Sequence, residues 1–159
     1  MKPTLYILCG APGCGKSTFA ENFSSQNIEW VSRDKIRFEI IKPDEEYFSH
    51  EKEVFRRYSK RIAETLSQGK STIADATHIN EVSRKKLTTA IDLTFSNYNI
   101  VYVIFTASAD TCIKHNKNRE GNALVPENII RRMRSSLTIP NHEDTREIGL
   151  ITIEGELEV

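Results

Sequence analysis

The segment GAPGCGKST, residues 10–18, follows an apolar run over residues 5–9 and precedes a stretch with helical spacing. It matches the phosphate-binding pattern G-x-x-x-x-G-K-[ST], in which a loop connects a strand to a helix. Glycines in such a loop let backbone N–H groups and the N-terminus of the helix face phosphate oxygens. This segment therefore constrains the chain to an α/β fold, and it predicts a site for the phosphates of a nucleotide.

Each residue of this loop has an expected role. Lys16 is expected to reach the β- and γ-phosphates of a triphosphate, and the Ser17 hydroxyl to coordinate Mg²⁺. The rest of the loop is expected to surround the phosphates through its backbone; these residues are Gly10, Ala11, Pro12, Gly13, Cys14, Gly15 and Thr18. The structural alternative is a glycine-rich turn that binds nothing, and the strand before it and the helix after it argue against that alternative.

Apolar runs alternate with helical patterns along the chain, which favours a three-layer α/β sandwich with a mainly parallel, five-stranded sheet. The predicted strands cover residues 5–9, 28–31, 71–74, 100–105 and 150–153. The first predicted helix follows residue 15, the second covers residues 51–68, and the third follows residue 80. Two more cover residues 110–118 and 126–137. In the helix after Asn80, we expect Val82, Leu87 and Ile91 to face inward. We predict a single domain over residues 1–159, with a helical lid at about residues 115–138.

Composition excludes few partners. Lysine plus arginine and aspartate plus glutamate both total 22, so the formal net charge is zero. This balance gives no whole-molecule argument for nucleic-acid binding, although it leaves room for a local basic face. Because no apolar run approaches the roughly 18 residues of a membrane span and no secretory signal is present, we expect a cytoplasmic protein that does not contact membranes. The sequence pattern does not distinguish a monomer from an oligomer.

The segment SRDKIR follows the second predicted strand. In an open parallel sheet, residues just beyond the carboxyl ends of the strands project into the crevice that holds the phosphate loop. There, Asp34 can accept the proton of an attacking hydroxyl, and Arg37 can hold an anionic group of the acceptor. The structural alternative makes Asp34 a helix N-cap with Arg37 as its ion-pair partner one turn later. The position alone supports both interpretations equally.

Two more residues are candidates for the same crevice. Asp75 ends the apolar strand over residues 71–74, where a carboxylate can bind Mg²⁺ directly or through water. Arg119 lies in a polar break between two predicted helices, where an arginine can close over a triphosphate and neutralise transition-state charge. The structural alternatives are a strand-terminating turn or helix cap for Asp75 and a solvated loop for Arg119.

The segments GAPGCGKST, SRDKIR, IADATHIN and NREGNALVP occur in this order. Together they resemble the kinase domain of phage-type polynucleotide 5′-hydroxyl kinases and, more broadly, the P-loop kinases among the AAA-like ATP-binding families. The resemblance covers about residues 3–138. It implies a P-loop NTPase-type fold, ATP as phosphoryl donor, Mg²⁺ as cofactor and a 5′-hydroxyl end of RNA or DNA as acceptor. The D-x-D-x-T motif of the phage phosphatase domain is absent, so the resemblance concerns the kinase part alone.

The resemblance also implies roles for single residues. Asp34 matches the general base for the acceptor hydroxyl, and Arg37 matches the arginine that contacts a phosphate of the acceptor. Asp75 matches the strand-end aspartate near the phosphate loop, and Arg119 matches the lid arginine on the transferring phosphate. The chain departs from the pattern at His115, where the phage enzymes carry a second basic residue.

Two other functions remain open at this stage. The first is a small-molecule kinase that acts on a sugar, nucleoside or antibiotic. A polynucleotide acceptor would instead predict a basic groove leading to Asp34, and its candidate residues are Arg37, Arg56, Arg57, Lys60 and Arg61. The second is a nucleotide-dependent switch without an acceptor. The segment NKNR at residues 116–119 is similar to the guanine-binding motif N-K-x-D of GTPases, but it lacks the aspartate that contacts guanine.

Overall fold

The computed structural model describes residues 2–119 and 124–154. Within them, five strands form one sheet: β1 (Thr4–Cys9), β2 (Ile28–Ser32), β3 (Ser71–Asp75), β4 (Asn99–Phe105) and β5 (Glu147–Ile153). Six helices connect them: α1 (Lys16–Phe23), α2 (Arg33–Ile40), α3 (Glu51–Ser67), α4 (Glu81–Asp92), α5 (Ala109–Asn116) and α6 (Glu127–Ser136). The predicted α/β fold is confirmed, and the sheet order is β2-β3-β1-β4-β5.

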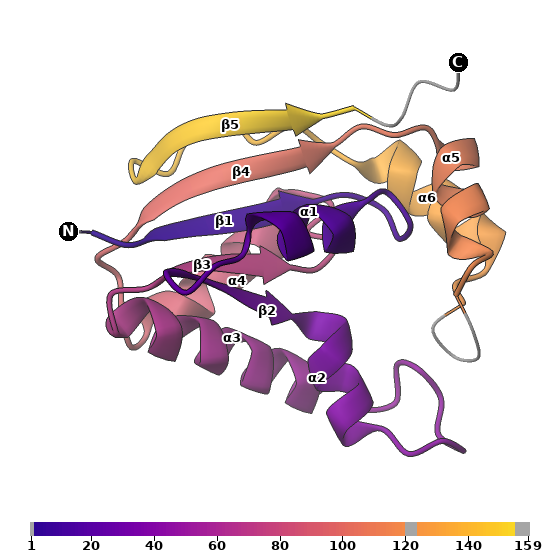
Figure 1. Cartoon of the computed structure of the whole chain (residues 1–159), viewed down its shortest axis with the longest axis horizontal. Coiled ribbons are helices and arrows are strands. Elements are labelled where there is room, and N and C mark those ends of the chain that lie inside the picture. Colours follow the sequence, from indigo (N-terminus) through magenta and orange to yellow (C-terminus); the bar gives the residue numbers. More distant parts are fainter. Residues whose placement is uncertain (1, 120–123, 155–159) are drawn as a thin grey trace.

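All neighbouring strands of the sheet run parallel. Parallel strands require crossover connections, and helices lie in each connection of this chain. Because the strands are parallel, all their arrowheads in Figure 1 point toward the same side of the molecule, where α5 and α6 lie. The carboxyl ends of the adjacent strands β2, β3 and β1 therefore meet at one edge of the sheet. The residues that follow those three strands are brought together there.

Two clusters of buried apolar residues fill the spaces on either side of the sheet. On one face, Leu5, Ile7 and Ile100 pack against α3 and α4 through residues such as Tyr58 and Leu87. On the other face, a second cluster contains β-strand residues together with residues of α1, α5 and α6. Figure 1 shows α1 on one side of the sheet and α3 and α4 on the other. The predicted three-layer arrangement is confirmed.

Some details differ from the sequence-based expectations. Val82 is 77% exposed, although Leu87 and Ile91 are buried as predicted. Val82 precedes Leu87 by five residues, which is about 140° around an α-helix, so the two cannot share a face. The strand β5 begins three residues earlier than predicted, at Glu147. Part of the predicted lid, residues 120–123, lies outside the described residues.

None of the helices in the described part of the chain combines the length and the apolar character needed to cross a membrane.

Candidate active site

The loop between β1 and α1 has the conformation that its glycines allow. Gly13 and Gly15 have φ angles of 82° and 103°, in the left-handed region that side chains rarely adopt. A Cβ atom on Gly13 would also lie 2.2 Å from the backbone oxygen of Cys112. Gly15 is the N-cap of α1, so no side chain covers the first N–H groups of that helix. The positive end of the helix is therefore open to an anion.

The remaining loop residues divide into those that face the cavity and those that support it. Lys16, Ser17 and Thr18 line the main cavity, together with Pro12, Gly13 and Gly15. Behind them, Ala11 and Cys14 are buried in the core. The Lys16 ammonium donates to the backbone oxygens of Gly10 and Ala11, at 3.0 and 2.9 Å. The Gly10 N–H donates to the Thr77 oxygen at 2.8 Å, which ties the loop to the segment after β3.

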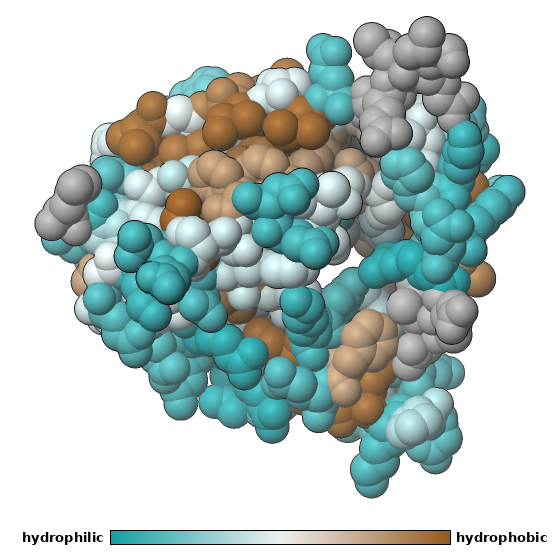
Figure 2. Space-filling model, in the orientation of Figure 1, coloured by the Kyte–Doolittle hydropathy of each residue, from teal (hydrophilic) through white to brown (hydrophobic). Residues whose placement is uncertain are grey.

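The cavity at the phosphate loop, which is the main cavity of the proposed site, has a volume of about 510 Å³; a second cavity, between α3 and the end of α4, has about 710 Å³. The lining of the main cavity comes from the phosphate loop, the ends of β2 and β3, α2, the segment after α2, α5 and α6. In Figure 2, a hollow is visible between the surface over α1 and α2 and the surface over α5 and α6. Asp34, Arg37, Asp75 and Arg119 all line this cavity with Lys16 and Ser17. The candidate residues from four separate segments are thus brought together.

Asp34 lies in the first turn of α2, directly after β2. The N-cap of this helix is Ser32, whose hydroxyl accepts a hydrogen bond from the Lys35 N–H at 3.2 Å. The structural alternative that made Asp34 the N-cap is therefore wrong, because a serine two residues earlier takes that position. The other half of that alternative is confirmed, since Arg37 forms an ion pair with Asp34 one turn later.

Arg37 is a buried arginine whose side chain is only 5% exposed. Its Nε and Nη2 donate to Glu51, at 2.9 and 2.6 Å. Its Nη1 donates to Asp34 and to the Tyr47 hydroxyl, and the guanidinium lies 4.2 Å from the centre of the Tyr47 ring. Burial alone would lower the pKa of Arg37, but its hydrogen bonds to Glu51 raise that pKa above its ordinary value. These contacts fix Arg37 beside Asp34.

Both carboxylate oxygens of Asp34 have partners. Oδ1 accepts hydrogen bonds from Arg37 and from the Tyr47 hydroxyl. Oδ2 accepts one from Arg119 at 2.9 Å, across 85 residues of sequence. Burial and the charge of Asp34 raise the pKa of Tyr47 well above its ordinary value, so this phenol stays a hydrogen-bond donor at neutral pH. No sequence pattern predicted Tyr47 or Glu51 at this site, since Tyr47 lies in an irregular segment and Glu51 begins a helix.

Asp75 is the last residue of β3 and is 6% exposed. Trp30, on the neighbouring strand β2, donates its indole N–H to Asp75 Oδ2 at 2.9 Å. Burial raises the pKa of Asp75, while the nearby Lys16 ammonium partly lowers it. Asp75 and the Ser17 hydroxyl are oxygen ligands of the kind that Mg²⁺ accepts. Within the described residues no cluster of three His, Cys, Asp or Glu is present, and Mg²⁺ beside a triphosphate needs only one or two protein carboxylates.

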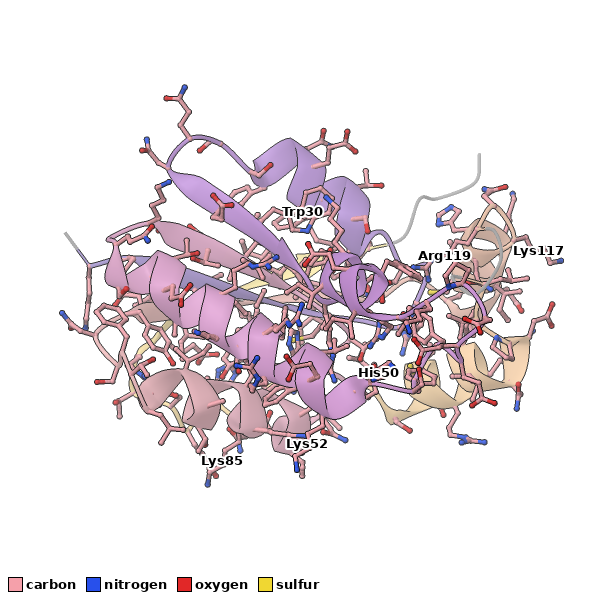
Figure 3. The ribbon with its side chains drawn as sticks, turned by 90° about the horizontal axis from the view of Figure 1, so that it is seen from below. Trp30, His50, Lys52, Lys85, Lys117 and Arg119 are labelled. Carbon is pink, nitrogen blue, oxygen red and sulfur yellow. The ribbon has the colours of Figure 1, made fainter. Side chains whose placement is uncertain are left out.

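The segment after α5 reaches the cavity from the opposite side. His115 Nδ1 lies 3.1 Å from the Gly13 oxygen, so α5 contacts the phosphate loop directly. The Asn116 side chain bonds both the N–H and the oxygen of Val125, at 3.1 and 2.7 Å, and this holds the two ends of the intervening segment together. In Figure 3, Lys117 points outward at the edge of the molecule and Arg119 lies closer to its centre. Arg119 is thereby directed toward Asp34.

The basic groove expected from α3 does not line the main cavity. Arg56 and Arg57 are exposed and pair with Glu53 on their own helix. Lys60 pairs with Glu64 on α3, and Arg61 pairs with Glu39 on α2. Arg56 and Lys60 line a second cavity, which shares Glu51 with the main cavity. A basic groove from α3 to Asp34 therefore stays a prediction. Of the residues proposed for the groove, only Arg37 is among those that line the main cavity.

A strand–loop–helix unit with left-handed glycines, a lysine and a serine at its end, and a charged cavity at the carboxyl edge of a parallel sheet defines a P-loop nucleotide-binding domain. A family model described as an AAA domain matches residues 5–140. The chain belongs to this family. The resemblance found in the sequence motifs is therefore confirmed at the level of family and fold.

Solved structures with this fold include kinases of different acceptors. A chain of the Pnkp1/Rnl/Hen1 RNA repair complex is 25% identical with a TM-score of 0.69; the match covers 86% of this chain and 44% of that one. A sugar kinase from Janibacter is 15% identical with a TM-score of 0.65, covering 97% of this chain and 86% of that one. A fungal RNA kinase is 12% identical with a TM-score of 0.69, covering 100% and 77%.

These comparisons establish the family and the fold. The chain has an AAA domain with a nucleotide-binding P-loop, and it shares its fold with solved kinases. It spans less than half of the RNA repair chain that it matches. The sugar kinase and the fungal RNA kinase share the fold, and their acceptors differ, so the acceptor has to be argued from the site itself.

Proposed function

We propose that this protein transfers the γ-phosphoryl group of ATP to the 5′-hydroxyl end of a polynucleotide, RNA or DNA. The observation that carries the proposal is the contact between Asp34 and Arg119 in the cavity that Lys16 and Ser17 also line. A carboxylate, a lid arginine and a phosphate-binding lysine in one cavity are the groups that phosphoryl transfer to a hydroxyl requires.

Each of these residues has a separate role in the proposed phosphoryl transfer. Asp34 accepts the proton of the 5′-hydroxyl as its oxygen attacks the γ-phosphorus, the bond to the β–γ bridging oxygen breaks, and ADP leaves. Lys16 and Arg119 stabilise the negative charge on the phosphoryl oxygens. Arg37 orients Asp34, and its proposed second role is a contact to an acceptor phosphate. Mg²⁺, held by Ser17 and by Asp75 directly or through water, neutralises part of the triphosphate charge when bound.

Two features support a polynucleotide acceptor. Two of the compared chains, at 25% and 26% identity, belong to Pnkp1/Rnl/Hen1 complexes, and one of these is described as an RNA repair complex. In addition, Arg33 and Arg119 line the same cavity as Asp34, and the exposed fractions of their side chains are 26% and 29%. Half-buried arginines in the same cavity as the proposed general base suit an acceptor that carries phosphates. We also propose that about residues 115–138, which include the end of α5 and all of α6, act as the lid.

The test is a transfer assay with γ-labelled ATP. The acceptors are RNA and DNA oligonucleotides with a 5′-hydroxyl, and the control is the same oligonucleotides with a 5′-phosphate. We expect label on the 5′-hydroxyl oligonucleotides alone. If no oligonucleotide is labelled while a small metabolite is, the polynucleotide proposal is wrong.

The second candidate is a small-molecule kinase. It is favoured by the finding that the basic residues of α3 do not line the main cavity. A cavity of about 510 Å³ also suffices for a sugar or nucleoside beside a nucleotide. The same assay with sugars, nucleosides and aminoglycosides as acceptors distinguishes this candidate.

A further inference from the structure

Exposed aromatic rings gather beside Asp34. Among the described residues, Phe38 and Phe48 are the exposed aromatic side chains, at 41% and 58%. Phe38 lies on α2, and Phe48 lies in the segment between α2 and α3. In Figure 2, brown and tan atoms lie over α2 and the adjoining segment, next to the hollow. Exposed apolar rings cost free energy in water, and burial against a ligand would recover it. Their position beside Asp34 therefore points to a contact with the acceptor.

Phe48 is the one of the two that lines the main cavity. Its ring packs edge-on against Tyr47, with 4.6 Å between centroids and an interplanar angle of 89°. Tyr47 is in turn fixed by hydrogen bonds to Asp34 and Arg37. The exposed ring is therefore held at a set position relative to the proposed general base, in spite of its place in an irregular segment.

We propose that Phe48 is the surface on which the nucleobase of the acceptor's 5′-terminal nucleotide stacks. This inference rests on the proposed function. A nucleobase and a phenyl ring both have flat faces, and such stacking contributes about 1–3 kcal/mol per base. A phenyl ring has no hydrogen-bonding group, so it accepts any of the bases. With the base on Phe48 and a neighbouring phosphate near the half-buried Arg33, the 5′-hydroxyl is directed to Asp34.

The experiment compares two acceptor oligonucleotides that differ only at the 5′-terminal nucleotide, which either carries its base or is abasic. For the wild-type protein, we expect kcat/KM to be about fivefold to hundredfold higher with the base present. In Phe48→Ala this ratio falls close to one. Phe48→Trp, which keeps a flat ring, retains the ratio.

Phe38→Ala is the matched control. It removes the other exposed phenylalanine, which also packs against Tyr47, at a centroid distance of 6.0 Å, but does not line the cavity. We expect Phe38→Ala to keep the wild-type ratio. Because the ratio compares two acceptors on the same protein, a smaller fraction of correctly folded variant does not change it.

The outcomes separate this inference from the function on which it rests. Equal use of the two acceptors by the wild type, or an unchanged ratio in Phe48→Ala, overturns the stacking role and leaves the polynucleotide kinase in place. Transfer to sugars with none to any 5′-hydroxyl oligonucleotide overturns the proposed function itself. A ratio that falls equally in Phe38→Ala and Phe48→Ala also overturns the specific role of Phe48.

Discussion

The two walls of the main cavity are built in different ways. The donor wall, residues 10–18, depends on backbone conformation: Gly13 and Gly15 are left-handed, and Lys16 bonds carbonyl oxygens of its own loop. The acceptor wall depends on side chains from three separate segments, with Arg37 and Arg119 meeting at Asp34. A contiguous motif can specify the first kind of wall, whereas only the tertiary structure assembles the second. Substitutions should therefore affect the two walls in different ways.

The largest expected effect is on the acceptor wall. In Asp34→Asn, the amide keeps the size of the carboxylate but accepts no proton from the hydroxyl. We expect kcat for transfer to fall by about 10²–10⁴-fold, the usual contribution of a general base. Affinity for ATP should stay within about twofold, since a neutral amide still lies in the same place and the donor wall is unaltered. Single-turnover transfer and equilibrium nucleotide binding measure the two quantities.

Lys16→Met is the complementary variant on the donor wall. It removes the ammonium that is expected to contact the β- and γ-phosphates, so both ATP binding and transfer should weaken. Loss of ATP binding in Asp34→Asn that equals the loss in Lys16→Met would show that the two walls do not act separately. Retained transfer in Asp34→Asn would remove Asp34 as the general base.

The next effect in size concerns the backbone of the donor wall. Gly13→Ala has to force a side chain into the left-handed region and against the Cys112 oxygen, 2.2 Å from the new Cβ. We expect the free energy of unfolding to fall by about 3 kcal/mol or more, because strain and a clash with backbone act together. Chemical denaturation measures this change.

Gly69→Ala is the control for the clash alone. Gly69 has the same φ of 82°, but a Cβ there meets nothing within 4 Å. Its cost should be the left-handed penalty of about 1–2 kcal/mol. If the two variants lose the same stability, the close approach of α5 to the phosphate loop does not constrain the donor wall.

The same contrast explains how far the sequence could predict the structure. The buried strands and the phosphate loop follow from local patterns, and the positions of Asp34 and Asp75 follow from the rule that strand ends meet at one edge. Arg119 was predicted from the polar break between two helices. Tyr47 and Glu51 were missed because their role depends on hydrogen bonds from Arg37. The segment between α2 and α3 that brings them to Arg37 has no regular pattern in the sequence. The sequence could not show that the α3 cations lie outside the main cavity, because their charge pattern does not reveal which face of the helix lies next to it.

Strand β5 was only partly predicted for a related reason. Its residues Ile148, Leu150 and Ile151 are 63%, 39% and 37% exposed, at the edge of the sheet. Neither face of this strand is fully buried. Such a strand does not have the continuous apolar run of an inner parallel strand. Pairing with β4, rather than its own pattern, determines where it begins.

The smallest predicted effect is a pH dependence of stability, and it concerns the donor wall. His78, directly after the Thr77 oxygen that holds the phosphate loop, is buried with a φ of 38°. Its Nδ1 donates to the Leu8 oxygen at 2.6 Å, and burial lowers the pKa of His78 to about 3. The donor wall thus depends on a neutral imidazole, whereas the acceptor wall depends on charged pairs.

Between the ordinary histidine pKa of 6.5 and about 3, the unfolded chain binds a proton at His78 that the folded protein does not bind. The contribution of His78 to stability is therefore complete above pH 6.5, and it falls by up to about 1.4 kcal/mol per pH unit as the pH decreases through this window. His78→Asn, which tolerates the left-handed backbone, should be less stable than the wild type at pH 7, and this difference should narrow by pH 5. The measurement is denaturant unfolding of both proteins at each pH. A difference that does not change with pH would mean that His78 is not held neutral, and that the donor wall rests on backbone geometry alone.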